Sequence, residues 1–159
     1  MGLNLVSFFP QLANQDQPEA SGSGSRAVSK RGRSKLPKGR FMILEVDPTG
    51  EPCEPVSVLG PYKTAIGVLV RDFIPIKYRF WVGKDQHQEW VVPNSVKDNV
   101  WEKVTEKFAF PGDCDMKIVK KRTLQTMSTC FKNFKGDLNK HMKNEIEPDW
   151  QEYPKQQQY

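Results

Sequence analysis

Cysteine and histidine are scarce in this sequence, which holds three cysteines and two histidines among 159 residues. Cys53, Cys114 and Cys130 are odd in number, lie far apart and form no Cys-x-x-Cys pair, so neither a disulfide framework nor a zinc site is favoured. A site assembled from Cys114, Cys130 and His141 is the alternative, although its spacing is unusual for zinc. His87 is isolated, no serine or cysteine stands in a nucleophile motif, and no glycine-rich phosphate loop follows a strand. We therefore expect no enzyme, no bound metal and no cofactor.

Long apolar runs are absent as well. Hydrophobic residues make up 37% of the chain, below the average of globular proteins, and no run approaches the ~20 residues of a membrane-spanning helix. The length suits one domain with a modest core and unstructured ends. We expect a disordered basic arm at residues 1–39, a helical domain at residues 40–147 and a polar tail at residues 148–159. Contact with a membrane is not expected.

Positive charge is abundant and is gathered in two blocks. The net charge is +5, yet residues 26–40 hold seven basic residues and no acid, and residues 116–143 hold eight against one acid, Asp137. The rest of the chain is therefore acidic overall. Two cationic blocks on an acidic chain suggest contact with a polyanion, whereas the alternative is a solvated tail and a solvated helix face. The stretch "KRGRSKLPKGR", residues 30–40, is also typical of a nuclear-import signal, so we expect the nucleus.

The first half of the domain mixes short strands with one helix. Residues 40–59, "RFMILEVDPTGEPCEPVSVL", predict a β-hairpin because "DPTG" is a turn sequence between apolar segments. A helix is predicted from Pro61, a good first helical residue, to Phe73, before the break at Pro75. Residues 74–82 alternate between apolar and basic side chains and predict an extended segment.

Two amphipathic helices follow. "PNSVKDNVWEKVTEKF" predicts a helix capped by Asn94 or Ser95, with Asp98 in a capping-box position. The second runs from about Asp115 to about Asn144. Its apolar residues step by three and four and form one continuous stripe: Leu124, Met127, Phe131, Phe134, Leu138 and Met142. The chain is therefore predicted to be a mainly α protein, a small helical domain with a short N-terminal β-hairpin.

Three of the four tryptophans lie in residues 81–101 and could be a core, a platform for stacked bases or a ligand cage. Trp101 lies on the apolar face of its predicted helix, so we expect it in the core. Trp81 ends the alternating segment and is expected to pack there too, because a stacking platform would need basic neighbours on both sides. Trp90, beside two valines, is expected to cover the same core.

Three segments of the chain are notable: "IGVLVRDFIPIKYRFWVGKDQHQEW", "SVKDNVWEKVTEKFAF" and "TLQTMSTCFKNFKGDLNKHM". Together they resemble the plant Ptta/En/Spm (CACTA-type) transposase domain, and the resemblance covers about residues 31–154. The matching positions are Ile66, Gly67, Arg71, Asp72, Ile74, Pro75, Ile76, Trp81, Lys97, Asp98, Trp101, Phe108, Phe131 and Phe134. In that family, tryptophan followed by tyrosine or tryptophan usually occupies the last two positions, after two lysines. Here Thr129 and Cys130 precede Phe131, which implies a weaker cationic edge.

The resemblance implies a DNA-binding or transposition-accessory module derived from a plant transposable element, since the family's catalytic core lies outside the matched region. Double-stranded DNA is then the expected partner, with a second copy or a transposase as a further one. Lys121, Lys132 and Lys143, spaced by eleven, lie on one line of the last helix, and Arg122 and Asn133 are the candidates for reading bases. The predicted DNA contacts are Lys30, Arg31, Arg33, Lys35, Lys121, Arg122, Lys132, Lys135, Lys140 and Lys143. The alternative is a protein interaction or oligomerisation module that pairs through its long C-terminal amphipathic helix.

Overall fold

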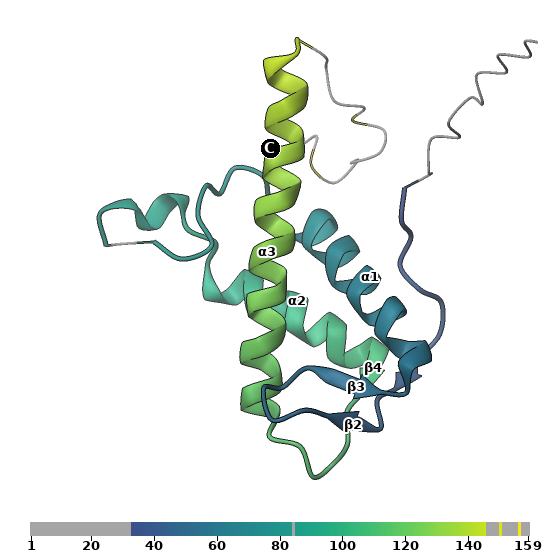
Figure 1. Cartoon of the computed structure of the whole chain (residues 1–159). Helices are drawn as coiled ribbons and strands as arrows, with labels where there is room; N and C mark the ends of the chain where they lie inside the picture. Colours follow the sequence, from purple (N-terminus) through teal and green to yellow (C-terminus); the bar gives the residue numbers. More distant parts are fainter. Residues whose placement is uncertain (1–32, 84, 146–149, 151–155, 157–159) are drawn as a thin grey trace, which may run out of the picture. The chain divides into compact units, whose positions relative to one another are not determined.

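The computed structural model describes residues 33–83, 85–145, 150 and 156. The chain divides into two units, Met1–Arg31 and Gly32–Tyr159, and the first lies outside the described residues. The described elements, in chain order, are β1 (Phe41–Met42), β2 (Glu45–Val46), β3 (Pro52–Glu54), α1 (Val56–Phe73), the 3₁₀ helix η1 (Asp85–Trp90), α2 (Asn94–Lys107), β4 (Phe108–Ala109) and α3 (Met116–Lys143) (Figure 1). The predicted mainly helical fold with a small β component is confirmed.

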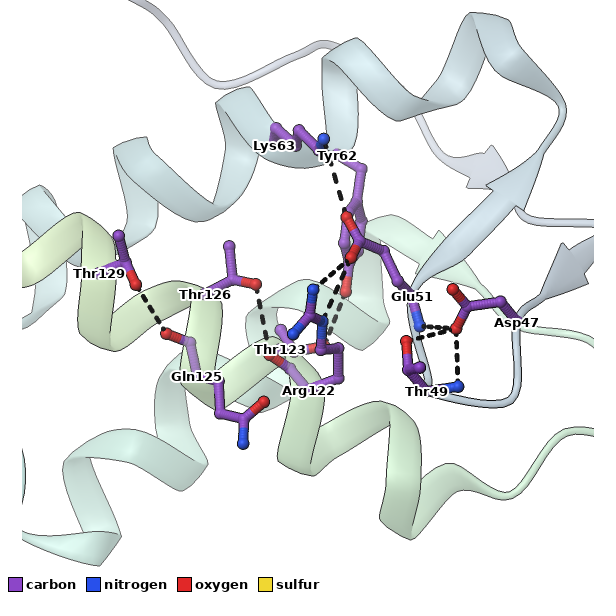
Figure 2. Close-up of polar contacts among 10 residues, drawn as sticks. All are labelled: Asp47, Thr49, Glu51, Tyr62, Lys63, Arg122, Thr123, Gln125, Thr126 and Thr129. Atoms are coloured by element: carbon purple, nitrogen blue, oxygen red, sulfur yellow. Dashed lines mark hydrogen bonds and ion pairs between the residues drawn. The ribbon is translucent and has the colours of Figure 1, made fainter.

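The predicted hairpin is confirmed in β2 and β3, which pair antiparallel. In its turn, the Asp47 carboxylate accepts hydrogen bonds from the Thr49 hydroxyl at 2.6 Å and from the Glu51 N–H at 3.0 Å (Figure 2). These bonds lower the pKa of Asp47. Phe41 does not belong to the hairpin: β1 pairs in parallel with β4, so that Phe41 faces Phe108. The hairpin, predicted from residue 40, therefore has its first strand only at β2.

Helix α1 begins at Val56, five residues before the predicted start at Pro61, which lies inside the helix. Proline removes one hydrogen bond from the helix at that point. The additional turn places Val58 four residues before Tyr62, and both side chains are buried. Apolar burial thus outweighs the missing bond.

The core lies where the three helices meet, since α1 packs against both α2 and α3 (Figure 1). On α3, the predicted stripe is buried at Met127, Phe131, Phe134 and Leu138. Met142 is 71% exposed. With 28 residues, α3 is longer than α1 with 18 or α2 with 14, and its last turns extend beyond both helices in Figure 1.

Of the two predicted N-terminal caps, the one at α3 is confirmed and the one at α2 is wrong. The Asp115 carboxylate accepts a hydrogen bond from the Lys117 N–H at 2.9 Å, so the predicted start of α3 is confirmed. At α2 the N-cap residue is Pro93, and no side chain caps the helix, so the predicted caps at Asn94 or Ser95 are wrong. Asp98 forms no capping box. Its carboxylate lies 2.8 Å from the Lys120 ammonium, which draws it toward α3.

Residues 74–82 form no strand, contrary to the sequence-based expectation. Their only bridge is between Phe80 and Val91 among the described residues. Side chains from elsewhere bind the backbone groups that a strand would need. The Gln156 amide donates to the carbonyl of Ile74 at 2.9 Å and accepts from the N–H of Ile76 at 3.0 Å, while the Lys135 ammonium donates to the carbonyl of Ile76 at 2.6 Å.

The ends assigned to the arm and the tail also contact the domain where they are described. Arg33 forms an ion pair with Asp72, the Lys107 ammonium donates to the carbonyl of Pro37 at 3.0 Å, and Leu36 packs against the core. Residues 33–39, predicted as part of the disordered arm, therefore lie against the helices. The rest of that arm and most of the tail lie outside the described residues.

A buried hydroxyl pair joins α1 to α3. The Thr123 hydroxyl donates to the carbonyl of Val119 at 2.8 Å, and the Tyr62 hydroxyl lies 2.7 Å from the same Thr123 oxygen (Figure 2). Because the threonine proton is already used, the Tyr62 O–H is the donor between them. Burial raises the pKa of Tyr62 to about 12.

Changes to this pair are expected to have unequal effects. Tyr62→Phe leaves Thr123 with its bond to Val119, so it should cost roughly 0.5–1.5 kcal/mol of unfolding free energy. Thr123→Val leaves the tyrosine donor buried and unpaired, and should cost more, roughly 1–3 kcal/mol. Urea titration monitored by circular dichroism measures both. Equal losses would contradict this assignment of the donor.

The same tyrosine makes stability depend on pH. Below pH 10, Tyr62 is protonated in both the folded and the unfolded chain and has no effect on pH dependence. Between pH 10 and 12 only the unfolded chain loses the proton, so the free energy of unfolding falls, by roughly 2–3 kcal/mol at the upper end. The wild type should therefore lose its advantage in free energy of unfolding over Tyr62→Phe, or become the less stable protein, between pH 10 and 12. An advantage that stays constant over this range would contradict the raised pKa of Tyr62.

Candidate nucleic-acid interface

Two neighbouring clefts open along one face of α3. The larger, about 850 Å³, lies between α3 and the loop at residues 79–82; the smaller, about 580 Å³, lies between that loop, α2 and the first half of α3. Trp81, Val82 and Ser128 line both clefts, so the two lie side by side. We call them together the basic groove; its cationic lining consists of Arg79, Lys97, Lys117, Lys120, Lys121, Lys132 and Lys135. No aspartate or glutamate is among the residues that line these two clefts.

Three lysines of the groove carry charge that no neighbour offsets. Lys117, Lys121 and Lys132 are exposed, and across the described part of the chain none of their ammonium groups makes an ion pair. Lys120, by contrast, pairs with Asp98. Phosphate is the natural partner of exposed ammonium groups on a helix face, because contact with it costs no rearrangement of existing ion pairs.

Two further lysines support the groove from within. Lys97 is 8% exposed, its ammonium lies 5.2 Å from the centre of the Trp81 ring, and burial lowers its pKa. The Lys135 ammonium is held by the carbonyl of Ile76, and burial lowers its pKa also. Both side chains bind the loop to the helices, so they position the residues that line the groove and are not themselves free to contact a ligand.

The tryptophans do not all behave as a core. Trp101 and Trp81 are only partly buried against it, and Trp81 packs at 6.0 Å from the Phe131 ring. Trp90 is 39% exposed, and the Arg79 guanidinium covers its ring at 4.8 Å. The expectation that Trp90 covers the core is wrong, because the neighbouring valines enter the core in its place.

Several predicted contact residues lie away from the groove. Arg122 binds Glu51 through two hydrogen bonds, of 2.7 and 3.2 Å (Figure 2), which raise its pKa. Lys140 lies 3.3 Å from Asp137. Asn133 lines a different cleft, which also includes Asp137. The structure thus directs Arg122 toward an acid of the hairpin rather than toward a ligand in the groove.

The remaining predicted contacts are scattered. Lys143 is exposed near the end of α3, beyond the lining of the groove. Lys35 is exposed, whereas Arg33 is paired with an aspartate of α1. Lys30 and Arg31 lie outside the described residues. Of the ten predicted contacts, the structure therefore brings together three in the groove, Lys121, Lys132 and Lys135.

Sequence reasoning missed four cations of the groove, namely Arg79, Lys97, Lys117 and Lys120. Arg79 lies in a loop whose path no periodicity reveals. Lys117 could have been found, because polar residues of α3 recur on one helical face beside the apolar stripe. The positions of that face are Lys117, Lys121, Ser128, Lys132, Lys135 and Asn139.

Neither a metal cluster nor a membrane span is found in the part of the chain that the structure describes. No group of three or more His, Cys, Asp or Glu side chains there could hold a metal ion, and none of its helices combines the length and the apolar character that crossing a membrane requires. No family model matches the chain, and neither does any curated protein or solved structure. The transposase family therefore stays a prediction from the sequence.

Proposed function

We propose that the protein is a non-catalytic DNA-binding module that holds duplex DNA along the basic groove. The observation that carries this proposal is the run of cations on one face of α3, with three unpaired lysines and no acid in the lining. Such a face attracts phosphates independently of base sequence. Exposed charges on a helix can make these contacts without any change in the fold.

The sequence adds an origin and a second contact. The resemblance to the Ptta/En/Spm domain supports an accessory role in transposition, and the basic residues of 30–40 support nuclear import and a further contact with the backbone or minor groove of DNA. We infer that the arm increases affinity while the groove fixes orientation. Lys30, Arg31 and Lys35 are the residues of the arm that serve this contact.

We rank lower the alternative of an interaction module that pairs through α3. Its central apolar residues, Met127, Phe131, Phe134 and Leu138, are buried in the chain's own core, so they offer no seam to another chain. Only the two ends of the helix expose large apolar side chains, at Met116, Ile118 and Met142. These ends lie far apart along a helix of 28 residues.

The test compares two charge-matched double variants. Lys121→Gln with Lys132→Gln removes two unpaired groove cations; Lys63→Gln with Lys140→Gln removes two cations that lie outside the groove and are paired with Glu51 and Asp137. We expect the groove variant to weaken binding to a labelled duplex by roughly tenfold, and to reduce the slope of log affinity against log salt by about 1.8. Fluorescence anisotropy over a salt series measures both quantities.

The control variant should leave affinity within about twofold and the salt slope unchanged. Glutamine has nearly the helix propensity of lysine, so both proteins should melt as the wild type does. Equal losses in the two variants would mean that net charge, not the groove, attracts DNA. Undetectable binding by the wild type would overturn the proposed function.

A further inference from the structure

Aromatic rings reach solvent inside the basic groove, at the loop that divides its two clefts. Phe80 is 44% exposed and Val82 is 78% exposed, and Trp81 lies between them with its ring partly buried. Phe80 and Trp81 line the larger cleft beside Arg79 and Lys132. Exposed apolar side chains that cluster beside cations mark a surface where a ligand can bind.

The loop that carries these rings is fixed by backbone hydrogen bonds. The N–H groups of Arg79 and Phe80 both donate to the carbonyl of Trp90, at 2.7 and 3.0 Å, and the N–H of Val92 donates to the carbonyl of Phe80 at 2.9 Å. Val92 is itself buried in the core. The backbone that carries the Phe80 ring is therefore fixed before any ligand arrives, which lowers the entropy that binding would lose.

A platform for stacked bases needs basic residues on both sides. The basic groove provides them on both sides of Trp81. Arg79 and Lys132 lie in the larger cleft, and Lys117 and Lys121 lie in the smaller one, beyond Trp81. In a duplex the faces of the bases are covered by their neighbours, so an exposed ring cannot stack on them. In an unpaired strand the faces are free, and rings beside a cationic track are how proteins hold such strands.

We propose that the basic groove takes an unpaired strand of DNA, with a base stacked on Phe80 at the edge of Trp81 and with phosphates bound by Arg79, Lys121 and Lys132. This inference rests on the proposed function, because the lysines that hold the backbone are the same. The larger cleft, at about 850 Å³, falls within the range of ~300–1,000 Å³ found for ligand sites.

The experiment measures binding of three labelled probes by fluorescence anisotropy: a thymidine oligomer of about fifteen nucleotides, a blunt duplex of equal length, and an abasic oligomer with the same phosphates. Phe80→Ala should weaken binding of the thymidine oligomer roughly 5- to 100-fold, and that of the duplex and the abasic strand by less than twofold. Phe80→Tyr, which keeps a ring, should bind the thymidine oligomer as the wild type does. Leu44→Ala removes exposed apolar surface from a site outside the groove, since Leu44 is 61% exposed and lines neither cleft, and should also leave binding unchanged.

The outcomes separate this inference from the proposed function. A duplex that binds while the thymidine oligomer does not would overturn the inference and leave the proposed function standing. Equal losses for all three probes in Phe80→Ala would also overturn it, because a phosphate contact rather than a base would be affected. If no probe binds the wild type, both fail. Thermal melting of each variant confirms that the fold is retained, which the exposure of Phe80 leads us to expect.

Discussion

Replacing Phe108 by alanine is expected to remove a large part of the stability of the domain, roughly 3–5 kcal/mol of unfolding free energy. The Phe108 ring is 1% exposed. It stacks on Phe41 at 5.3 Å and meets the Tyr62 ring edge-on at 5.1 Å. It also stands where α2 ends, since its N–H donates to the carbonyl of Val104. The Phe108 ring therefore joins the parallel strand pair to α1, while its backbone N–H closes the end of α2.

The loss would be large relative to the total, because small domains are stable by only about 5–15 kcal/mol. We expect the melting temperature to fall by roughly 10–25 °C. Phe80→Ala is the matched control, since it removes the same ring from a half-exposed site and should cost less than about 1 kcal/mol. Replacing Trp101, which is only partly buried, by alanine should cause a loss of unfolding free energy between those of the Phe108 and Phe80 variants. Similar melting temperatures for the Phe108 and Phe80 variants would contradict this picture of the core.

The fold was predictable where local chemistry and periodicity agree. The start of α3 follows from Asp115 and its length from one continuous apolar stripe, and both match. The hairpin follows from its turn residues. The pairing of Phe41 with Phe108 has no local signal, because two-residue strands distant in sequence meet only after the helices have packed. The early start of α1 was hidden by Pro61, since the benefit comes from burying Val58 against other elements.

The site was predictable only in part, for an electrostatic reason. Sequence places Lys121, Lys132 and Lys135 on one helix, and the structure brings them into the groove. The charge of Arg122, however, is offset by Glu51, an acid 71 residues away. Which cations stay available depends on such distant partners, and no spacing rule along one helix can supply them. The position of Arg79 likewise depends on how the loop is tied to Trp90.

Substitution of Gly50 by alanine is expected to disrupt the packing of the hairpin turn against α3. Gly50 has φ of +89°, and a Cβ there would lie 2.6 Å from the carbonyl oxygen of Ile118 and 2.9 Å from the nitrogen of Val119. Both are backbone atoms inside a helix and cannot move aside separately. The turn would have to shift, which also pulls Glu51 from Arg122. Backbone strain of about 1–3 kcal/mol and overpacking of about 1–3 kcal/mol add to an expected loss of roughly 2–6 kcal/mol.

Two other glycines separate the causes of that loss. Gly39 has nearly the same φ, +87°, with nothing within 4 Å of its would-be Cβ, so Gly39→Ala should show the strain alone. Gly67 lies inside α1 with open space around it, so Gly67→Ala should stabilise the protein by roughly 0.5–1 kcal/mol through helix propensity. Chemical denaturation of the three variants should therefore rank them Gly50, Gly39, wild type, Gly67 in rising stability. If the Gly50 and Gly39 variants lose equal amounts, the contact between the turn and the backbone of α3 contributes nothing, and the hairpin is held by the Glu51–Arg122 pair instead.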